Sequence, residues 1–222
     1  MRIVYLHGFA SSPQSSKARF FAAKFAQRAI PVEIPMLDRG DFTSLTVTGQ
    51  LEAVSNAVAE KPAVLMGSSL GGYIAALFAA RHALVEKLIL MAPAFRFPSR
   101  WRERYPAAEM DRWKRDGTYP IFHYGYGTEL PLGYQFVEDS LRYEEEPEFK
   151  QPALVLHGRR DPIVPAGISE TYAARHKNAI LRLFDAGHEL TDVLDRMWME
   201  IIQFLELGDE KHSSKIGRSS SI

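Results

Sequence analysis

The chain of 222 residues contains no cysteine. Disulfide bonds, cysteine-ligated zinc and a catalytic thiol are therefore excluded. No apolar run approaches about 20 residues, the length that a membrane-spanning helix requires. The opening residues, MRIVYLHGF, lack the apolar stretch and the small-residue cleavage site of a signal peptide. We therefore expect a cytoplasmic protein without a membrane span.

Neither sign of charge is in excess, because 27 Lys and Arg residues balance 27 Asp and Glu residues. Proteins that bind nucleic acid or membrane surfaces through charge carry a basic surplus, so neither partner is expected. There is no G-x-G-x-x-G or Walker loop for a nucleotide. The segment HELTD begins like the zinc motif H-E-x-x-H, but its fifth residue is Asp192. We expect neither a cofactor nor a metal.

Short apolar runs alternate with longer segments whose apolar residues recur at helical spacing. Six runs have the pattern of strands, at residues 3–8, 32–35, 63–67, 87–93, 153–158 and 179–187. Helical patterns separate or follow them, at residues 16–29, 51–60, 70–82 and 190–207. Strands that are apolar throughout and separated by helices indicate a parallel sheet covered on both sides. The predicted fold class is α/β, a mostly parallel six-stranded sheet with helices on both faces.

Two segments depart from this alternation. Residues 95–150 form about a quarter of the chain but hold 13 of its 25 aromatic residues, and they are too long for a plain loop. We interpret them as a cap inserted into a core formed by residues 1–94 and 151–207. The alternative is a helical excursion that merely covers the sheet. Residues 208–222 have little apolar content and are expected to be a disordered tail.

The segment LMGSSLGG at 65–72 contains the pattern G-x-S-x-G. The pattern is centred on Ser69, with Gly67 and Gly71 at its ends, and it cannot be centred on Ser68. An apolar strand precedes it and a helical segment follows, so it predicts a nucleophile elbow that lifts the serine hydroxyl clear of the sheet. Side chains at the two glycine positions would collide across so tight a turn. The alternative is a glycine-rich turn without chemistry.

A serine hydroxyl is a weak nucleophile at neutral pH and needs a base. The chain order Ser, Asp or Glu, then His points to His188 in DAGHEL and to Asp161 in HGRRDPIVP. Both follow predicted strands, at the sheet edge where open α/β sheets build their sites. The alternatives are a structural histidine and a turn-forming aspartate. Three acidic residues lie closer to His188 in sequence but rank lower, because proximity does not orient an imidazole: Asp185, Glu189 and Asp192.

A tetrahedral intermediate needs hydrogen-bond donors for its negative oxygen. One should be the backbone N–H of Leu70, which follows the candidate nucleophile. The second should come from the loop after the first strand, where Gly8 lets the backbone approach and the N–H of Phe9 is the expected donor. His7 is interpreted as a hydrogen-bonding residue that holds this loop rather than as a second base.

The motifs HGF, GSSLGG, HGRRDPIVP and DAGH together resemble those of the α/β-hydrolase superfamily, over roughly residues 2–94 and 151–207. The opening YLHGFASSPQSSKA is similar to that of the compact bacterial YqiA-type esterases within it. The resemblance implies a serine hydrolase that acts on esters or thioesters without a cofactor. The insert at 95–150 looks longer than a minimal member needs, which leaves the choice of substrate open.

Three functional hypotheses follow. In the first, Ser69 attacks a small-molecule carboxylic ester or thioester, His188 takes its proton and Asp161 orients the imidazole, so that an acyl-enzyme forms. In the second, the same groups cleave a lactone, a peptide or a carbon–carbon bond. In the third, the chain is a non-catalytic binding protein on a hydrolase scaffold.

The composition of residues 95–150 suggests a role in substrate binding. We expect an apolar acyl pocket roofed by some of its aromatic residues, which include Phe95, Phe97, Trp101, Trp113, Phe122, Tyr124 and Tyr126. Its first half is also basic. We interpret these charges as a solvated face. The alternative is a binding site for an anionic leaving group such as a coenzyme A phosphate, and substitution of Arg100, Arg102 and Arg104 would test it.

Overall fold

The computed structural model describes residues 1–208, so all of the expected tail except Gly208 lies outside the described residues. Six strands form one sheet in the order β2-β1-β3-β4-β7-β8, and every neighbouring pair is parallel. This arrangement confirms the predicted fold class. The strands are β1 (Ile3–Leu6), β2 (Val32–Glu33), β3 (Ala63–Ser68), β4 (Val85–Met91), β7 (Ala153–Gly158) and β8 (Ala179–Phe184).

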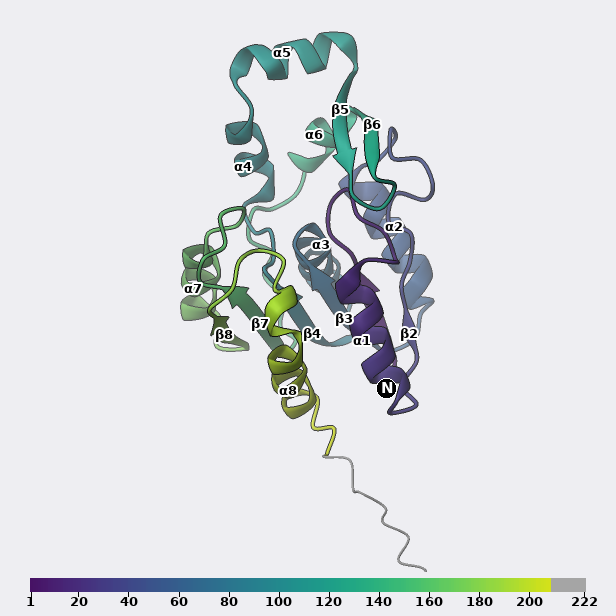
Figure 1. Cartoon of the computed structure of the whole chain (residues 1–222), viewed down its shortest axis with the longest axis vertical. Helices are drawn as coiled ribbons and strands as arrows, with labels where there is room; N and C mark the ends of the chain where they lie inside the picture. The colour runs from purple at the N-terminus through teal and green to yellow at the C-terminus, as the bar shows by residue number, and fades with distance from the viewer. Residues whose placement is uncertain (209–222) are drawn as a thin grey trace, which may run out of the picture.

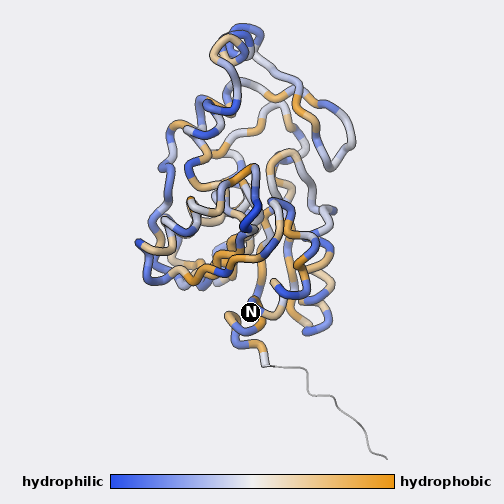
Figure 2. The backbone as a smooth tube through the Cα atoms, turned by 60° about the vertical axis from the view of Figure 1, so that its left-hand side comes forward, coloured by the Kyte–Doolittle hydropathy of each residue, from blue (hydrophilic) through white to orange (hydrophobic). Residues whose placement is uncertain are grey.

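Helices cover both faces of the sheet (Figure 1). Alternate side chains of a strand point to opposite faces, and in β3 Leu65 packs into one buried apolar cluster while Val64 and Met66 pack into the other. Figure 2 shows that the hydrophobic segments of the chain gather in this central layer. One face is covered by α1 (Ser16–Ala26) and α8 (Leu194–Phe204), the other by α2 (Val47–Val58), α3 (Leu70–Ala79) and α7 (Ala166–Arg175).

The helix boundaries differ from the predicted ones where the chain supplies a cap or a turn. α2 begins four residues earlier than expected because the Thr46 hydroxyl accepts a hydrogen bond from the Gly49 amide at 2.9 Å. A short 3₁₀ turn, Thr191–Val193, precedes α8. Helix α7 was not predicted, since its buried residues include only Ser169 and Tyr172. No helix within residues 1–208 has the length and apolar content needed to cross a membrane.

Residues 95–150, called the insert below, combine helices with a β-hairpin, so the insert is not purely helical. Backbone hydrogen bonds join it to the loops that follow β1 and β3: the Tyr124 amide donates to Ala10 and the Ala94 amide, at its border, to Ser69. It therefore stands over the carboxyl ends of the strands (Figure 1). Its elements are α4 (Phe97–Arg104), α5 (Ala107–Asp116), β5 (Thr118–His123), β6 (Thr128–Gly133) and α6 (Gln135–Ser140).

The aromatic residues of the insert divide into two groups. Those on its helices and borders pack against each other and against the core, and the buried ones include Phe95, Phe97, Trp101, Trp113 and Phe136. Three residues of the hairpin are exposed instead: Phe122 by 48%, Tyr124 by 77% and Tyr126 by 56%. Much of the aromatic excess therefore attaches the insert to the sheet.

Candidate active site

Ser69 makes the turn between β3 and α3 alone, since β3 ends at Ser68 and α3 begins at Leu70. Its backbone angles are φ 53° and ψ −117°, a conformation that non-glycine residues rarely adopt. Four backbone hydrogen bonds hold it there, and three of them are accepted by its own carbonyl oxygen. The neighbouring Ser68 is buried, with 5% exposure, whereas Ser69 is partly exposed. The hydroxyl that can meet a substrate is therefore that of Ser69.

The two glycines of the motif are required for different reasons. A Cβ at Gly67 would overlap the carbonyl of Gly71, which is the collision across the turn that the sequence predicts. A Cβ at Gly71 would instead overlap the backbone carbonyls of Leu6 and His7, at the end of β1. The second glycine therefore allows α3 to start against the neighbouring strand, which corrects the reason inferred from the turn alone.

Three side chains from separate loops form one hydrogen-bonded chain. The Oγ of Ser69 lies 3.0 Å from Nε2 of His188, and Nδ1 of His188 lies 2.7 Å from Oδ2 of Asp161. His188 follows β8 and Asp161 follows β7, so adjacent parallel strands deliver both to the same edge of the sheet. The Asp161 side chain is fully buried, and the His188 side chain retains 12% exposure.

Asp161 is held through both carboxylate oxygens. Its Oδ1 accepts hydrogen bonds from the Ile163 and Val164 amides, each at 2.8 Å. Its Oδ2 also lies 3.2 Å from Nε2 of His157, a residue that the sequence analysis did not single out. Burial opposes ionisation, but the hydrogen bonds from His157, His188 and Val164 outweigh it and hold the pKa of Asp161 well below its usual range. The carboxylate therefore stays charged at neutral pH.

The competing acids are engaged elsewhere. Asp185 pairs with Arg160 at 2.8 Å, and Glu189 pairs with Lys17 at 3.1 Å. Asp192 lies in the 3₁₀ turn before α8 and forms no hydrogen bond with His188 in the part of the chain that is described. Asp161 is thus the acid that contacts the imidazole.

The two expected amide donors belong to different elements that approach each other at Ser69. Leu70 follows Ser69 directly, and a Cβ built on Gly8, just before Phe9, would lie 3.6 Å from the Cβ of Ser69. Within residues 1–208, neither the Phe9 amide nor the Leu70 amide donates a hydrogen bond to another group. Both N–H groups therefore remain available to an acceptor beside Ser69.

The loop after β1 is held by contacts with the core on one side and with the insert on the other. His7 is buried, its Nδ1 lies 3.0 Å from the Gly8 carbonyl, and burial lowers its pKa. On the other side, the Phe9 ring packs against Trp101 of α4 at 4.8 Å between ring centroids. The Tyr124 amide of the hairpin donates to the Ala10 carbonyl at 2.8 Å. The insert and the core thus position this loop jointly.

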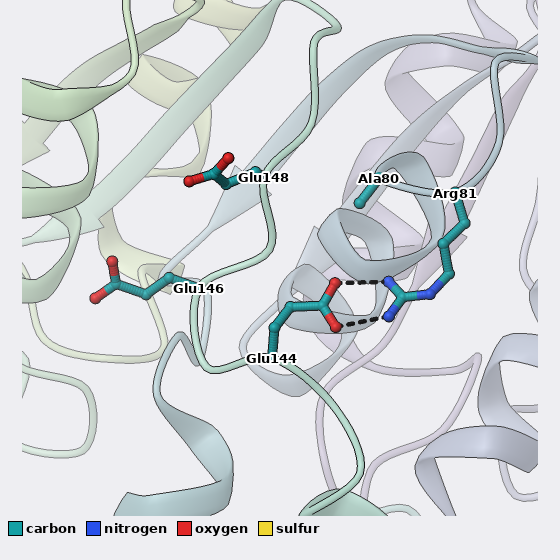
Figure 3. A pocket seen from close by; sticks show the side chains of 5 residues that line it. All are labelled: Ala80, Arg81, Glu144, Glu146 and Glu148. Atoms are coloured by element: carbon teal, nitrogen blue, oxygen red, sulfur yellow. Dashed lines mark hydrogen bonds and ion pairs between the residues drawn. The ribbon is translucent and has the colours of Figure 1, made fainter.

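Two open cavities lie away from these residues. One, of about 550 Å³, is acidic and contains a bidentate pair between Arg81 and Glu144, with distances of 2.8 and 2.6 Å (Figure 3). The other, of about 500 Å³, lies between the loop at 38–43 and the hairpin. Neither is lined by Ser69 or His188, so neither is the expected acyl pocket. No group of three His, Asp or Glu side chains within residues 1–208 is arranged to hold a metal ion.

Comparisons with known proteins support the fold. A family model described as an uncharacterised protein family, UPF0227, matches residues 2–206. The comparison with curated proteins found no match. Among solved structures, the chain resembles the α/β-hydrolase domain-containing protein 10 from mouse, with a TM-score of 0.75 and 21% identity, covering 93% of this chain and 90% of that one.

Two bacterial structures are similar to the same degree. A putative hydrolase from Agrobacterium vitis has a TM-score of 0.76 and 24% identity, with 91% of this chain and 87% of that one covered. Est1E from Butyrivibrio proteoclasticus, solved with ferulic acid bound, has a TM-score of 0.76 and 19% identity, with 93% and 88% covered. These matches confirm the resemblance to the α/β-hydrolase superfamily at the level of the fold.

Proposed function

The chain belongs to the UPF0227 family and has the α/β-hydrolase fold, and from this premise we propose that it is a serine hydrolase of carboxylic esters or thioesters. The observation that carries the proposal is the hydrogen-bonded chain from Ser69 through His188 to Asp161. It joins a strained, partly exposed serine to a base and joins that base to a buried carboxylate. This is the arrangement that acyl transfer to a serine requires.

The first half of the reaction forms an acyl-enzyme. The Oγ of Ser69 attacks the acyl carbon while Nε2 of His188 takes the hydroxyl proton, and the carbonyl electron pair moves onto its oxygen. The Phe9 and Leu70 amides donate hydrogen bonds to that oxygen. When the carbonyl reforms, the bond to the alcohol or thiol breaks, and the leaving group takes the proton from His188.

The second half repeats these steps with water. His188 takes a proton from the attacking water, the intermediate collapses, and Oγ of Ser69 leaves with that proton, which frees the carboxylic acid. In both halves the imidazole is transiently positive. The buried Asp161, ionised because of its lowered pKa, stabilises that charge and keeps Nδ1 protonated, so that Nε2 is free to accept.

The insert is proposed to act as a cap over residues 1–94 and 151–207, because its contacts lie at the strand ends that carry the reactive groups. The basic residues of α4 are partly committed to structure. Arg100 donates a hydrogen bond to the Ile163 carbonyl beside Asp161, and the Arg104 guanidinium lies 6.0 Å from the Trp101 ring centroid. These contacts favour anchoring of α4 over binding of a coenzyme A phosphate. An ester without an anionic leaving group is therefore the preferred substrate class.

Labelling of the whole chain with a fluorophosphonate probe tests the proposal. We expect covalent attachment at Ser69, which Ser69→Ala abolishes. Ser68→Ala is the matched control, because Ser68 is buried and outside the hydrogen-bonded chain, and it should retain labelling. A panel of p-nitrophenyl and coenzyme A esters of increasing acyl length would then define the substrate. Loss of labelling in Ser68→Ala alone, or a wild-type chain that takes no label, would refute the proposal.

A further inference from the structure

Asp161 has a second histidine neighbour that the proposed reaction does not use. His157 lies on β7, four residues before the acid, and its side chain is completely buried. Its Nε2 lies 2.9 Å from the Val164 carbonyl and 3.2 Å from Oδ2 of Asp161. Its Nδ1 lies 2.8 Å from the Ser169 hydroxyl of α7. All of the polar atoms of this ring are therefore engaged.

The neighbours of the ring determine where its proton lies. Both groups facing Nε2, the Val164 carbonyl and the Asp161 carboxylate, are acceptors only, so Nε2 must carry a hydrogen. The Ser169 hydroxyl can donate, and it satisfies Nδ1 in that role. The N–H of His157 thus bonds to the Val164 carbonyl and lies beside the same carboxylate oxygen that His188 contacts.

We propose that His157 is a positioning residue that holds Oδ2 of Asp161 in line with Nδ1 of His188, with Ser169 fixing the ring that does so. This inference rests on the proposed function. The Ile163 and Val164 amides anchor only Oδ1. Without His157, the sole side-chain donor on Oδ2 among residues 1–208 would be His188 itself. The carboxylate could then turn together with the imidazole that it has to orient.

The proposal also explains why a polar histidine occupies a position in a fully buried strand. A hydrogen bond to an ionised group is stronger than one between neutral groups, and Nε2 supplies it from within the sheet. The other titratable or charged groups that face the pair are His188 and Arg100 of α4, whose guanidinium also favours the charge on Asp161. The carboxylate thus has hydrogen-bond donors on both oxygens and one guanidinium that favours its charge.

The experiment measures the rate of fluorophosphonate labelling as a function of pH in four single variants of the whole chain. His157→Leu removes the donor at similar volume, and His157→Gln replaces it, because the glutamine amide reaches the place of Nε2. Ser169→Ala removes only the hydroxyl that orients the ring. Val155→Ala, a buried change on the same strand that removes no polar group, is the control for stability.

We expect His157→Leu to slow labelling on the plateau roughly 10- to 100-fold. The pH of half-maximal labelling should move upward, because Oδ2, freed from a competing donor, stabilises the protonated form of His188 more strongly. His157→Gln should recover most of both values, and Ser169→Ala should change them less in the same direction. Val155→Ala should lower the melting temperature without moving the pH profile.

Several outcomes would overturn the proposal. An unchanged pH profile in His157→Leu, with a rate no lower than that of Val155→Ala, would leave His157 a packing residue only. If His157→Leu does not fold, the other two variants decide. His157 would be a packing residue only if Ser169→Ala has the wild-type pH profile and His157→Gln labels much more slowly without a shift of its profile. A wild-type chain that takes no label would overturn the proposed function as well, which separates the two failures.

Discussion

The two sides of the candidate site are built from different parts of the molecule. On one side, Ser69, Asp161 and His188 follow β3, β7 and β8 of the parallel sheet, and backbone hydrogen bonds fix both the turn at Ser69 and the carboxylate of Asp161. On the other side, Phe9 lies on a loop that depends on the insert, through its contact with Trp101 and the backbone bond between Tyr124 and Ala10.

The candidate catalytic side chains and the proposed oxyanion donor Phe9 are therefore positioned by different parts of the fold. Parallel strands bring the three candidate catalytic side chains to one edge of the sheet, because the carboxyl ends of the strands lie there. The loop after β1 is held at its far end by the insert, so the proposed cap also positions a proposed oxyanion donor. Changes to the hydrogen-bonded side chains or to the turn at Ser69 should therefore have large effects on activity or folding. Changes to contacts that only support the loops, on either side, should have smaller effects.

The largest effect on activity is expected on the sheet side at Asp161. Asp161→Asn should lower kcat by about 10⁴ because the amide cannot hold His188 in the reactive tautomer. Asp185→Asn is the matched control, since Asp185 pairs only with Arg160 on the surface. Ester hydrolysis by the two purified variants measures the difference, and the reverse ranking would reassign the acid.

Asp161 should also leave a signature in stability. Its pKa is lowered in the folded chain, so its contribution to the free energy of unfolding is complete above the ordinary aspartate pKa of about 3.9. That contribution is lost as the pH falls from there toward the lowered value. Melting temperatures between neutral pH and about pH 3 should therefore fall less steeply for Asp161→Asn than for the wild type.

The strongest effect on folding is expected at Gly71, also on the sheet side. In Gly71→Ala the new Cβ would overlap the backbone carbonyls of Leu6 and His7, which cannot move without disturbing β1. We expect a loss of about 3 kcal/mol in the free energy of unfolding. In Gly167→Ala, in α7, the new Cβ would lie 4.0 Å from a side-chain oxygen of Glu170, an ordinary contact, so the change should be neutral or stabilise by about 0.5 kcal/mol. Urea denaturation of both variants measures this; equal stabilities would contradict the packing argument.

On the insert side, Gly125→Ala should weaken activity with little loss of stability. The added Cβ would lie 2.7 Å from the Cβ of Ser12, which pushes the hairpin away from the loop that carries Phe9. We expect kcat to fall roughly tenfold, which is less than the loss of about 10²- to 10³-fold expected when one oxyanion donor is removed completely. Tyr124→Ser is the control, because the Tyr124 side chain is 77% exposed and only its backbone holds the loop. A wild-type rate in Gly125→Ala would show that the hairpin does not position the donor.

The smallest effect is expected at Lys17, where α1 meets the loop that carries His188. Lys17 is buried and donates to the Glu189 carbonyl at 2.7 Å and to its carboxylate at 3.1 Å. Lys17→Met should lower kcat several-fold, because the residue next to His188 loses a backbone anchor. Glu189→Gln leaves the carbonyl bond in place and should change kcat little, since the Glu189 side chain is 74% exposed. Equal losses in both variants would assign the effect to the ion pair instead.

The sequence by itself determined the α/β class and the place of the turn at Ser69. Apolar runs and helical spacing reflect which faces are buried, and they recover the six strands of the sheet. The G-x-S-x-G pattern is equally local, since both glycines are close in sequence to the turn that needs them. The order of Ser69, Asp161 and His188 along the chain follows from strand order, which explains why local motifs sufficed to find three side chains that hydrogen bond in space.

Only the tertiary structure decided the contacts between distant segments. His157 looks like one more residue of a buried strand until Ser169 and Asp161 are packed around it, and Gly71 is required by a strand more than 60 residues earlier in the chain. Composition likewise predicted that some aromatic residues of the insert roof a pocket without saying which, and packing buries four of the seven that were named. Burial and hydrogen bonding depend on which surfaces meet, and that is fixed by the whole fold rather than by any one stretch of sequence.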